Sequence, residues 1–293
     1  MSFVPRERYR TGFSLVELIV VIVVTGILVG IMGNFIARPI EGYHRLTQRA
    51  TLIDVAESAL RRMARDVRNS VPNSLRVGGG DRVLELLYAV DGARYRSAID
   101  SGSHVTVDDV LSFTGTDAAW NILGRFNNLS FVYDTPLAAN YRIVIYPTGE
   151  SVYQDVEDDV GTVSPSTATI TISDDDPDED KITLSNAHQF ALASPRERLY
   201  IFDSPVTYIC DLVAGTLTRY NSYAIDGAQP TDPTIAPLSG ADSARVADHL
   251  TSCTFTYQAG TSTRAGLLTI NLELSQGGEN VDLLHQIHVV NVP

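Results

Sequence analysis

The sequence predicts an α+β fold, in which one long N-terminal helix packs on an antiparallel, β-rich domain. Two patterns predict this arrangement. Residues 1–71 combine a long apolar run with an amphipathic repeat of helical period, and residues 72–293 consist of short alternating segments between turn residues. Strands do not alternate with helices and no nucleotide-binding fingerprint occurs, so the sequence does not predict a parallel α/β sheet.

An apolar run near the N-terminus is long enough to cross a membrane. Residues 18–37 carry no charge, and a helix of this length spans about 30 Å, which is the thickness of a bilayer's hydrocarbon core. Glu17 lies at the start of this run. An unpaired carboxylate at membrane depth costs about 2–3 kcal/mol. We therefore expect Glu17 to have a partner.

The flanking charges predict the orientation of this helix. Arg6, Arg8 and Arg10 precede the run against only Glu7, which favours a cytoplasmic N-terminus and places the later residues on the far side of the membrane. Three arginines between residues 38 and 49 weaken this bias. The run is longer than the apolar region of a secretory signal peptide, so we expect residues 13–37 to be retained as the transmembrane half of the helix.

Two glycines interrupt the apolar run with the spacing of a helix-packing motif. Gly26 and Gly30 form G-x-x-x-G, which lets the backbones of neighbouring helices approach closely. We expect this pair to lie at a contact between helices.

A second, amphipathic half of the helix is expected at residues 38–71. Pro72 and the three glycines at 78–80 end the pattern. The expected buried positions are Leu46, Ala50, Ile53, Leu60, Ala64 and Val67.

The β-rich domain is expected to occupy residues 72–293. Asp91 and Gly92 separate two apolar segments and predict a two-residue hairpin turn. The predicted strands are 83–90, 93–99, 130–134, 141–147, 167–173, 199–202, 205–210, 216–223, 253–257, 266–274 and 281–290.

The two cysteines lie in predicted strands beyond the membrane. In an oxidising compartment we expect Cys210 and Cys253 to form a disulfide, with two buried free thiols as the alternative. Closing a loop of this length stabilises the fold by roughly 4 kcal/mol in the chain-entropy model. Neither cysteine belongs to a Cys-x-x-Cys motif, so the sequence predicts neither a zinc site nor a redox centre.

Composition and motifs argue against several functions. A net charge of −13 disfavours binding to nucleic acid. The acidic run at residues 174–180 lacks the spaced glycine and final glutamate of an EF-hand loop, so we interpret it as a solvated turn, with a calcium site as the alternative, and predict no metal and no cofactor. No G-x-S-x-G, H-E-x-x-H or P-loop motif occurs, and no catalytic residue is predicted. A membrane-anchored hydrolase is the alternative from another functional class.

The N-terminus resembles the leader of type IV prepilins. The residues that carry the resemblance are a short basic leader, Gly12, the aromatic Phe13, Glu17 at the fifth position after the glycine, and the apolar run. The resemblance implies that a prepilin peptidase cuts after Gly12 and that Phe13 becomes N-methylated. Residues 1–12 are then the cleaved leader. It also implies that Glu17 pairs with the new N-terminus of a neighbouring subunit during assembly.

The later part of the chain is similar to the large minor pilins related to J-type pseudopilins, and among them to the biogenesis proteins of the MSHA (mannose-sensitive haemagglutinin) pilus. The similar segments are PVTYICDLVAGTLTRY, SCTFTYQ, GLLTINLEL and VDLLHQIHVVNVP, together with the earlier LELLYAVDGARYR. This resemblance implies a type IV pilin-like fold and a non-enzymatic subunit that acts in pilus initiation or at the pilus tip. The implied partners are other minor pilins, the major pilin, prepilin peptidase and the inner-membrane assembly platform. A J-like pseudopilin of a type II secretion system is the alternative.

Overall fold

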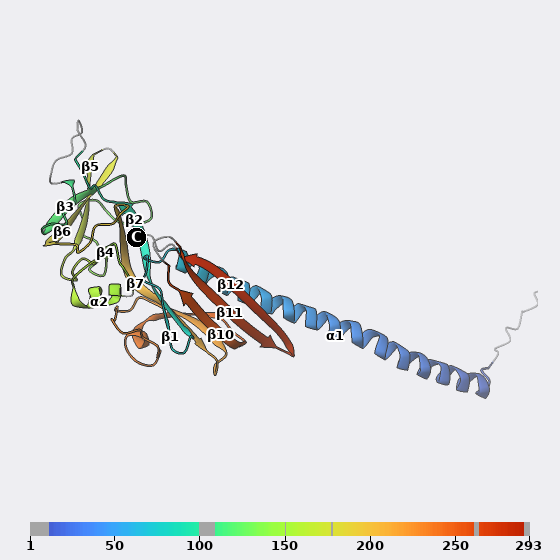
Figure 1. The fold of residues 1–293 in the computed structure, drawn as a ribbon. Helices are drawn as coiled ribbons and strands as arrows, with labels where there is room; N and C mark the ends of the chain where they lie inside the picture. The colour runs from blue at the N-terminus through green and yellow to red at the C-terminus, as the bar shows by residue number, and fades with distance from the viewer. Residues whose placement is uncertain (1–11, 100–108, 150, 177, 261–263, 290–293) are drawn as a thin grey trace, which may run out of the picture. The chain divides into compact units, whose positions relative to one another are not determined.

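The computed structural model describes residues 12–99, 109–149, 151–176, 178–260 and 264–289. It forms two units, Met1–Thr51 and Leu52–Pro293, and the helix α1 (Leu15–Arg68) begins in the first and ends in the second. Figure 1 shows α1 and the antiparallel sheets that follow it in the chain. The predicted α+β fold, with a long N-terminal helix and a β-rich antiparallel domain, is confirmed.

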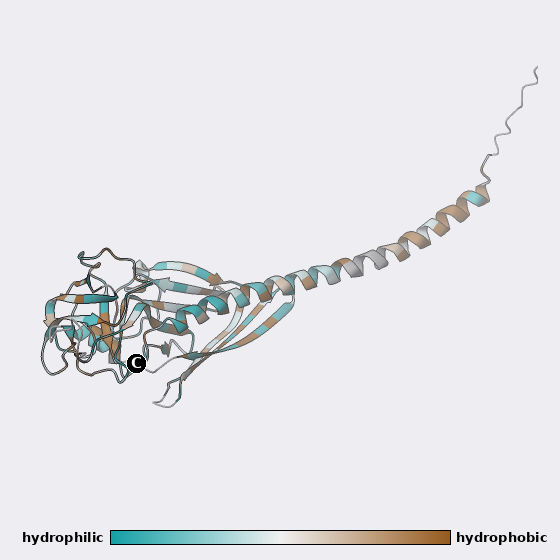
Figure 2. Ribbon diagram, turned by 90° about the horizontal axis from the view of Figure 1, so that it is seen from above, coloured by the Kyte–Doolittle hydropathy of each residue, from teal (hydrophilic) through white to brown (hydrophobic). Residues whose placement is uncertain are grey.

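The helix α1 changes character along its length. Figure 2 shows an apolar first part and a mixture of polar and apolar residues further on. In the second unit, small and apolar side chains at intervals of three and four residues are buried. They are Leu52, Ala56, Ala59, Leu60, Met63, Ala64 and Val67. The predicted stripe is wrong at Leu46, which is 70% exposed, and at Ala50, which is also exposed, and Ile53 is only partly buried. The buried stripe instead includes Ala56, Ala59 and Met63, which the prediction omitted.

The main sheet of the second unit has six antiparallel strands in the order β1-β2-β7-β8-β9, with β4 also paired to β7. The long strand β7 pairs with β2 on one edge and, on the other, with β4 and β8 at successive parts of its length. The strands are β1 (Arg76–Gly78), β2 (Val83–Arg94), β4 (Arg142–Ile145), β7 (Arg198–Asp211), β8 (Thr216–Asn221) and β9 (Asp242–Ala247).

Two three-stranded antiparallel sheets complete the unit. One has the order β10-β11-β12 and the other β3-β6-β5. Their strands are β3 (Asp117–Ile122), β5 (Ile170–Asp176), β6 (Glu179–His188), β10 (Leu250–Gln258), β11 (Gly266–Gln276) and β12 (Glu279–Val289). The short helices are α2 (Ser151–Asp158) and the 3-10 turn Leu238–Gly240.

The predicted hairpin at Asp91 and Gly92 is wrong, because β2 runs through both residues and pairs with β7. The Asp91 carboxylate accepts three backbone N–H groups from residues 127–129 at 2.7–3.1 Å, which ties a loop to this strand. A Cβ on Gly92 would lie 3.0 Å from a ring carbon of Tyr200. Gly92 therefore serves a close approach to this ring rather than a reversal of the chain.

The core of the second unit consists of separate apolar clusters. The largest joins the buried stripe of α1 to β2, β7 and the inner face of β10-β11-β12. A second cluster, around Trp120 and Ile182, lies between the β3-β6-β5 sheet and one end of the main sheet. A third packs Val152 and Tyr153 of α2 against Val144 and Phe202. The end of α1 is thus held by two sheets at once.

Candidate functional site

The residues before α1 leave the predicted cleavage site outside any helix or strand. Gly12, Phe13 and Ser14 precede the helix, and the Phe13 side chain is 78% exposed. A Cβ placed on Gly12 would meet no atom within 4 Å, so packing within the chain does not require a glycine there. The rest of the predicted leader, residues 1–11, lies outside the described residues.

Ser14 caps the N-terminus of α1. The backbone N–H of Glu17 donates to Ser14 Oγ at 3.3 Å, and the backbone N–H of Leu18 donates to the Ser14 carbonyl at 3.2 Å. Ser14 and Glu17 have the S-x-x-E spacing of a capping box, in which the glutamate also lies beside the positive end of the helix dipole. Our sequence reasoning missed Ser14, although this spacing before an apolar run is a signal that identifies it.

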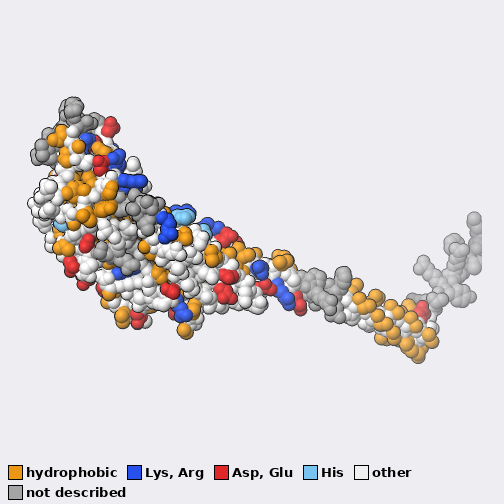
Figure 3. Space-filling view, in the orientation of Figure 1, with side chains coloured by type: hydrophobic (Ala, Val, Ile, Leu, Met, Phe, Trp, Pro, Cys, Tyr) orange, Lys and Arg blue, Asp and Glu red, His pale blue; other side chains and the backbone are white. Residues whose placement is uncertain are grey.

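Glu17 is the single charge in the part of α1 that can span a membrane. Leu15–Met32 is long and apolar enough to cross a bilayer, and none of this window is buried by the rest of the structure. Figure 3 shows hydrophobic side chains covering this part of the helix. Within the described residues, no hydrogen bond or ion pair satisfies the Glu17 carboxylate. A membrane around this span would leave the carboxylate without a counter-charge from the described part of the chain.

Gly26 and Gly30 lie within the same exposed stretch of α1. A Cβ on either residue would meet nothing within 4 Å, so neither glycine is needed for packing inside the chain. Each costs roughly 1 kcal/mol of helix propensity relative to alanine. A close approach of another helix would offset this cost, and the structure leaves the surface open for one.

Asp66 fixes the end of α1 to the main sheet. It is a buried carboxylate on the apolar side of the helix, and it accepts hydrogen bonds from the Tyr208 hydroxyl and from Arg219 Nε, both at 2.7 Å. Burial raises the pKa of Tyr208, and the charge of Asp66 raises it further, so the phenol stays protonated and donates. The arrangement locks the helix at a fixed register on β7 and β8.

A disulfide joins Cys210 in β7 to Cys253 in β10. Both cysteines are buried in the largest apolar cluster. The bond therefore connects the main sheet to the β10-β11-β12 sheet beside α1.

The acidic run at residues 174–180 forms the end of the β5-β6 hairpin, with residue 177 outside the described part. The interpretation as a solvated turn is wrong for Asp180, which is fully buried and accepts from the Tyr133 hydroxyl at 2.8 Å and the Phe126 N–H at 3.0 Å. Other carboxylates of the run face cations. The ion pairs are Arg125–Asp174, Lys181–Asp175 and Arg96–Glu179. Within the described residues, no group of three His, Cys, Asp or Glu side chains is placed to hold a metal.

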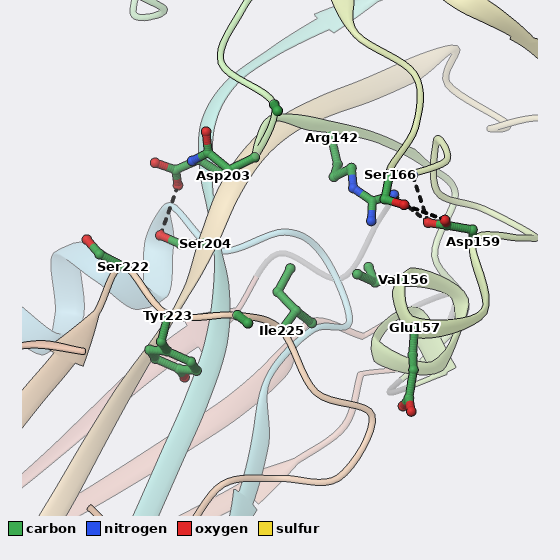
Figure 4. Close-up of a pocket in the computed structure, with 13 residues that line it drawn as sticks. Arg142, Val156, Glu157, Asp159, Ser166, Asp203, Ser204, Ser222, Tyr223 and Ile225 are labelled. Carbon is green, nitrogen blue, oxygen red and sulfur yellow. Dashed lines mark hydrogen bonds and ion pairs between the residues drawn. The ribbon is translucent and has the colours of Figure 1, made fainter. Parts of the chain in front are cut away.

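A cavity of about 610 Å³ lies between α2 and the main sheet (Figure 4). On one side Arg142 donates to Asp159 at 2.9 Å, and Ser166 donates to the same carboxylate. On the other side the Ser204 hydroxyl lies 3.3 Å from Asp203 Oδ1. No histidine, cysteine or lysine lines the cavity, so it does not assemble the Ser-His-Asp arrangement of a hydrolase.

Comparison with known proteins identifies the N-terminal segment. Residues 8–33 match the family described as the prokaryotic N-terminal methylation motif. The matched stretch includes Gly12, Phe13 and Glu17 and the whole span Leu15–Met32. No curated protein and no solved structure matches the chain. The N-terminal segment is therefore a prepilin-type leader followed by a membrane-capable helix, as in type IV pilins and pseudopilins.

Proposed function

We propose that this chain is a non-enzymatic minor pilin, a structural subunit that acts in the initiation or at the tip of a type IV pilus of the MSHA type. The observation that carries the proposal is the prepilin motif at residues 8–33, which includes the apolar start of α1, a helix whose other end is fixed in a β-rich unit. The MSHA assignment is supported only by the resemblance of segments in the β-rich part of the chain.

The proposed route begins in the inner membrane, with the N-terminus in the cytoplasm. Prepilin peptidase removes residues 1–12 and the new terminal amine of Phe13 is methylated. The subunit then leaves the membrane through the assembly platform and joins other minor pilins and the major pilin. The exposed Phe13 and the open surface around Gly26 and Gly30 support this route, because the described part of the chain covers neither of them and both are free to contact another subunit.

Glu17 is the residue we assign to assembly. Cleavage after Gly12 creates a cationic amine on Phe13, and a small axial stagger between neighbouring helices places one chain's Glu17 beside another chain's amine. Because such a pair neutralises two charges in an apolar setting, removing one partner leaves the other unpaired, which costs about 3–5 kcal/mol.

The decisive experiment is the intact mass and N-terminal sequence of the protein produced with and without prepilin peptidase. We expect a chain that begins at N-methylated Phe13 only when the peptidase is present. A Gly12→Val variant should stay uncleaved. Since no atom crowds the Cβ position of Gly12, this loss would report on the peptidase and not on the fold. An unprocessed terminus beside active peptidase would overturn the proposal.

A Glu17→Gln variant tests the assembly role separately from processing. We expect normal membrane insertion and normal cleavage, but loss of the subunit from sheared pili. The matched control is Glu41→Gln, which removes one exposed carboxylate from the same helix beyond the apolar span. Equal incorporation of both variants would show that Glu17 has no assembly role.

The tip assignment rests on size. The second unit, Leu52–Pro293, is large for a subunit repeated along a tightly packed filament. Immuno-gold labelling should therefore mark pilus ends, and even labelling along filaments would contradict a tip position.

A J-like pseudopilin of a type II secretion system is the second candidate, because pseudopilins carry the same N-terminal motif. Deleting the gene distinguishes the two functions. Loss of surface pili with normal protein secretion supports the pilus, and the reverse result supports the secretion system.

A further inference from the structure

Four arginines lie on the exposed side of the last two turns of α1: Arg61, Arg62, Arg65 and Arg68. Spacings of three and four residues place them next to one another on the helix surface. After Glu57 the only carboxylate of the helix is Asp66, which is buried against Tyr208 and Arg219. These four residues, the arginine face, are therefore a positive surface on a chain of net charge −13.

Most of this charge is uncompensated. Arg61 pairs with Glu57 at 2.8 Å, whereas Arg62, Arg65 and Arg68 form no ion pair within the described residues. The negative end of the helix dipole accounts for cations in the last turn, where Arg65 and Arg68 lie. It does not account for Arg62.

The arginine face ends at a cavity of about 580 Å³ that Arg68 helps to line. The cavity also exposes the side chains of Asn69, Tyr88, Asn128 and Tyr200, which can all donate hydrogen bonds. Its one carboxylate, Asp91, is already occupied by backbone N–H groups from residues 127–129 and from Gly92. The asparagine and tyrosine side chains can accept as well as donate, so it is the positive charge of Arg68 that favours a ligand that accepts hydrogen bonds.

We infer that the arginine face and this cavity form one docking surface for an acidic peptide segment of a partner subunit. A carboxylate of the segment enters the cavity and accepts from Arg68 and the neighbouring donors, while further carboxylates lie along Arg62 and Arg65. Charge complementarity favours an acidic protein segment, and the cavity, which is open to solvent on one side and lined by two tyrosines, has room for one of its side chains. The inference rests on the proposed role as a pilus subunit and names the chemistry of one partner contact.

The test uses the full-length protein in a neutral detergent and a fluorescein-labelled peptide of ten glutamates, followed by fluorescence anisotropy. The variant Arg62→Glu/Arg65→Glu/Arg68→Glu reverses the surface. The control Arg82→Glu/Arg196→Glu/Arg245→Glu makes the same change in net charge at exposed arginines outside the helix. The milder variant Arg62→Gln/Arg65→Gln/Arg68→Gln removes the same three charges without reversing them. It keeps the test valid if the charge reversal misfolds the end of the helix.

We expect wild type and control to bind the peptide within threefold of each other, and both variants of the arginine face to bind about tenfold more weakly. Binding should also weaken as salt is raised. Equal losses in control and face variants, or no preference of wild type for glutamates over a ten-glutamine peptide, would overturn the inference. If phosphatidylglycerol in the detergent micelles bound the wild type and the control but not the arginine-face variants, and displaced the peptide, the inference would be overturned in favour of a lipid surface.

The N-terminal segment is unchanged in all these variants, so the two proposals fail separately. A chain that is processed at Gly12 but does not bind the peptide overturns only the docking surface. A chain that binds the peptide but is never processed overturns only the proposed function.

Discussion

Ser14 and Glu17 show how few side chains define the start of α1. Four backbone N–H groups at a helix N-terminus lack partners within the helix, and in a membrane no water replaces them. Ser14 Oγ accepts one of these groups, the N–H of Glu17. The same two residues lie next to the proposed cleavage bond, so the helix is already formed two residues after the new terminus.

We predict that Ser14→Ala frays the first turn of α1. Removal of an N-cap hydroxyl costs about 1 kcal/mol, so the amides of the first turn should exchange with solvent roughly fivefold faster. Hydrogen exchange of the full chain in detergent measures this. Ser58→Ala is the control, since Ser58 is exposed in the middle of the same helix. Unchanged exchange in Ser14→Ala would show that the cap contributes nothing.

At the residue scale, the sequence allowed the N-terminal motif and the cysteine pair to be singled out, because both depend on local patterns. Gly92 was misread for a physical reason. A glycine after an aspartate is the usual signal of a tight turn, yet this glycine makes room for the ring of Tyr200, which lies more than a hundred positions away. A contact at that distance has no local signature.

Asp66 gives α1 its fixed position as an element. The apolar stripe of the helix repeats along its length, whereas the buried carboxylate of Asp66 meets Tyr208 and Arg219 in one register only. Its side chain is only 10% exposed and that of Arg219 14%. Glu57 and Arg61 form a chemically similar pair on the same helix, with 51% and 67% exposed.

We predict that Asp66→Asn destabilises the second unit by about 3 kcal/mol, because it leaves Arg219 buried without a counter-charge. Glu57→Gln should cost less than about 0.5 kcal/mol, because its pair is solvated. Thermal unfolding of the two variants, followed by circular dichroism in detergent, makes the comparison. Equal shifts in both would contradict the argument that burial decides the outcome.

Elements were predicted best where an alternating pattern was long and uninterrupted, as in β11 and β12. The predicted segments 199–202 and 205–210 are one strand, β7, which continues through Pro205. The helix α2 was missed because it is only 8 residues long, although its apolar residues have helical spacing, and it is held by the burial of Val152 and Tyr153. The strand β6 was missed because it begins inside the acidic run.

The loop after α2 gives a pH-dependent prediction. Burial raises the pKa of Asp159, but hydrogen bonds from Ser166 and Arg142 outweigh it, so the pKa lies below its ordinary value of 3.8. A carboxyl whose pKa is lower in the folded state stabilises the fold above its unfolded pKa, and this stabilisation disappears as the pH falls through the folded value. Asp159→Asn should thus lower the unfolding temperature at pH 7 and have progressively less effect below about pH 4. An equal effect at pH 7 and pH 3 would contradict this assignment.

At the scale of the whole molecule, the sequence predicts the class of fold but not the order in which the strands pair. The leader, the apolar run and the class of fold follow from composition and spacing, which are local or averaged properties. The topology does not, because β7 lies at the centre of the main sheet and pairs with strands from both earlier and later parts of the chain. The arginine face could not be identified from the sequence either, because the argument for it requires that Asp66 is buried and that a cavity lies beside Arg68.

The disulfide is the covalent link between two sheets of the second unit, and its removal should affect the whole unit. The Cys210→Ser/Cys253→Ser variant loses a cross-link across 43 positions, which corresponds to roughly 4 kcal/mol in the chain-entropy model. We expect its unfolding temperature to fall by roughly 10 °C. Dithiothreitol should lower the wild-type value to that of the variant and leave the variant unchanged. If reduced wild type instead unfolds at the oxidised temperature, packing of α1 against both sheets holds them together without the bond.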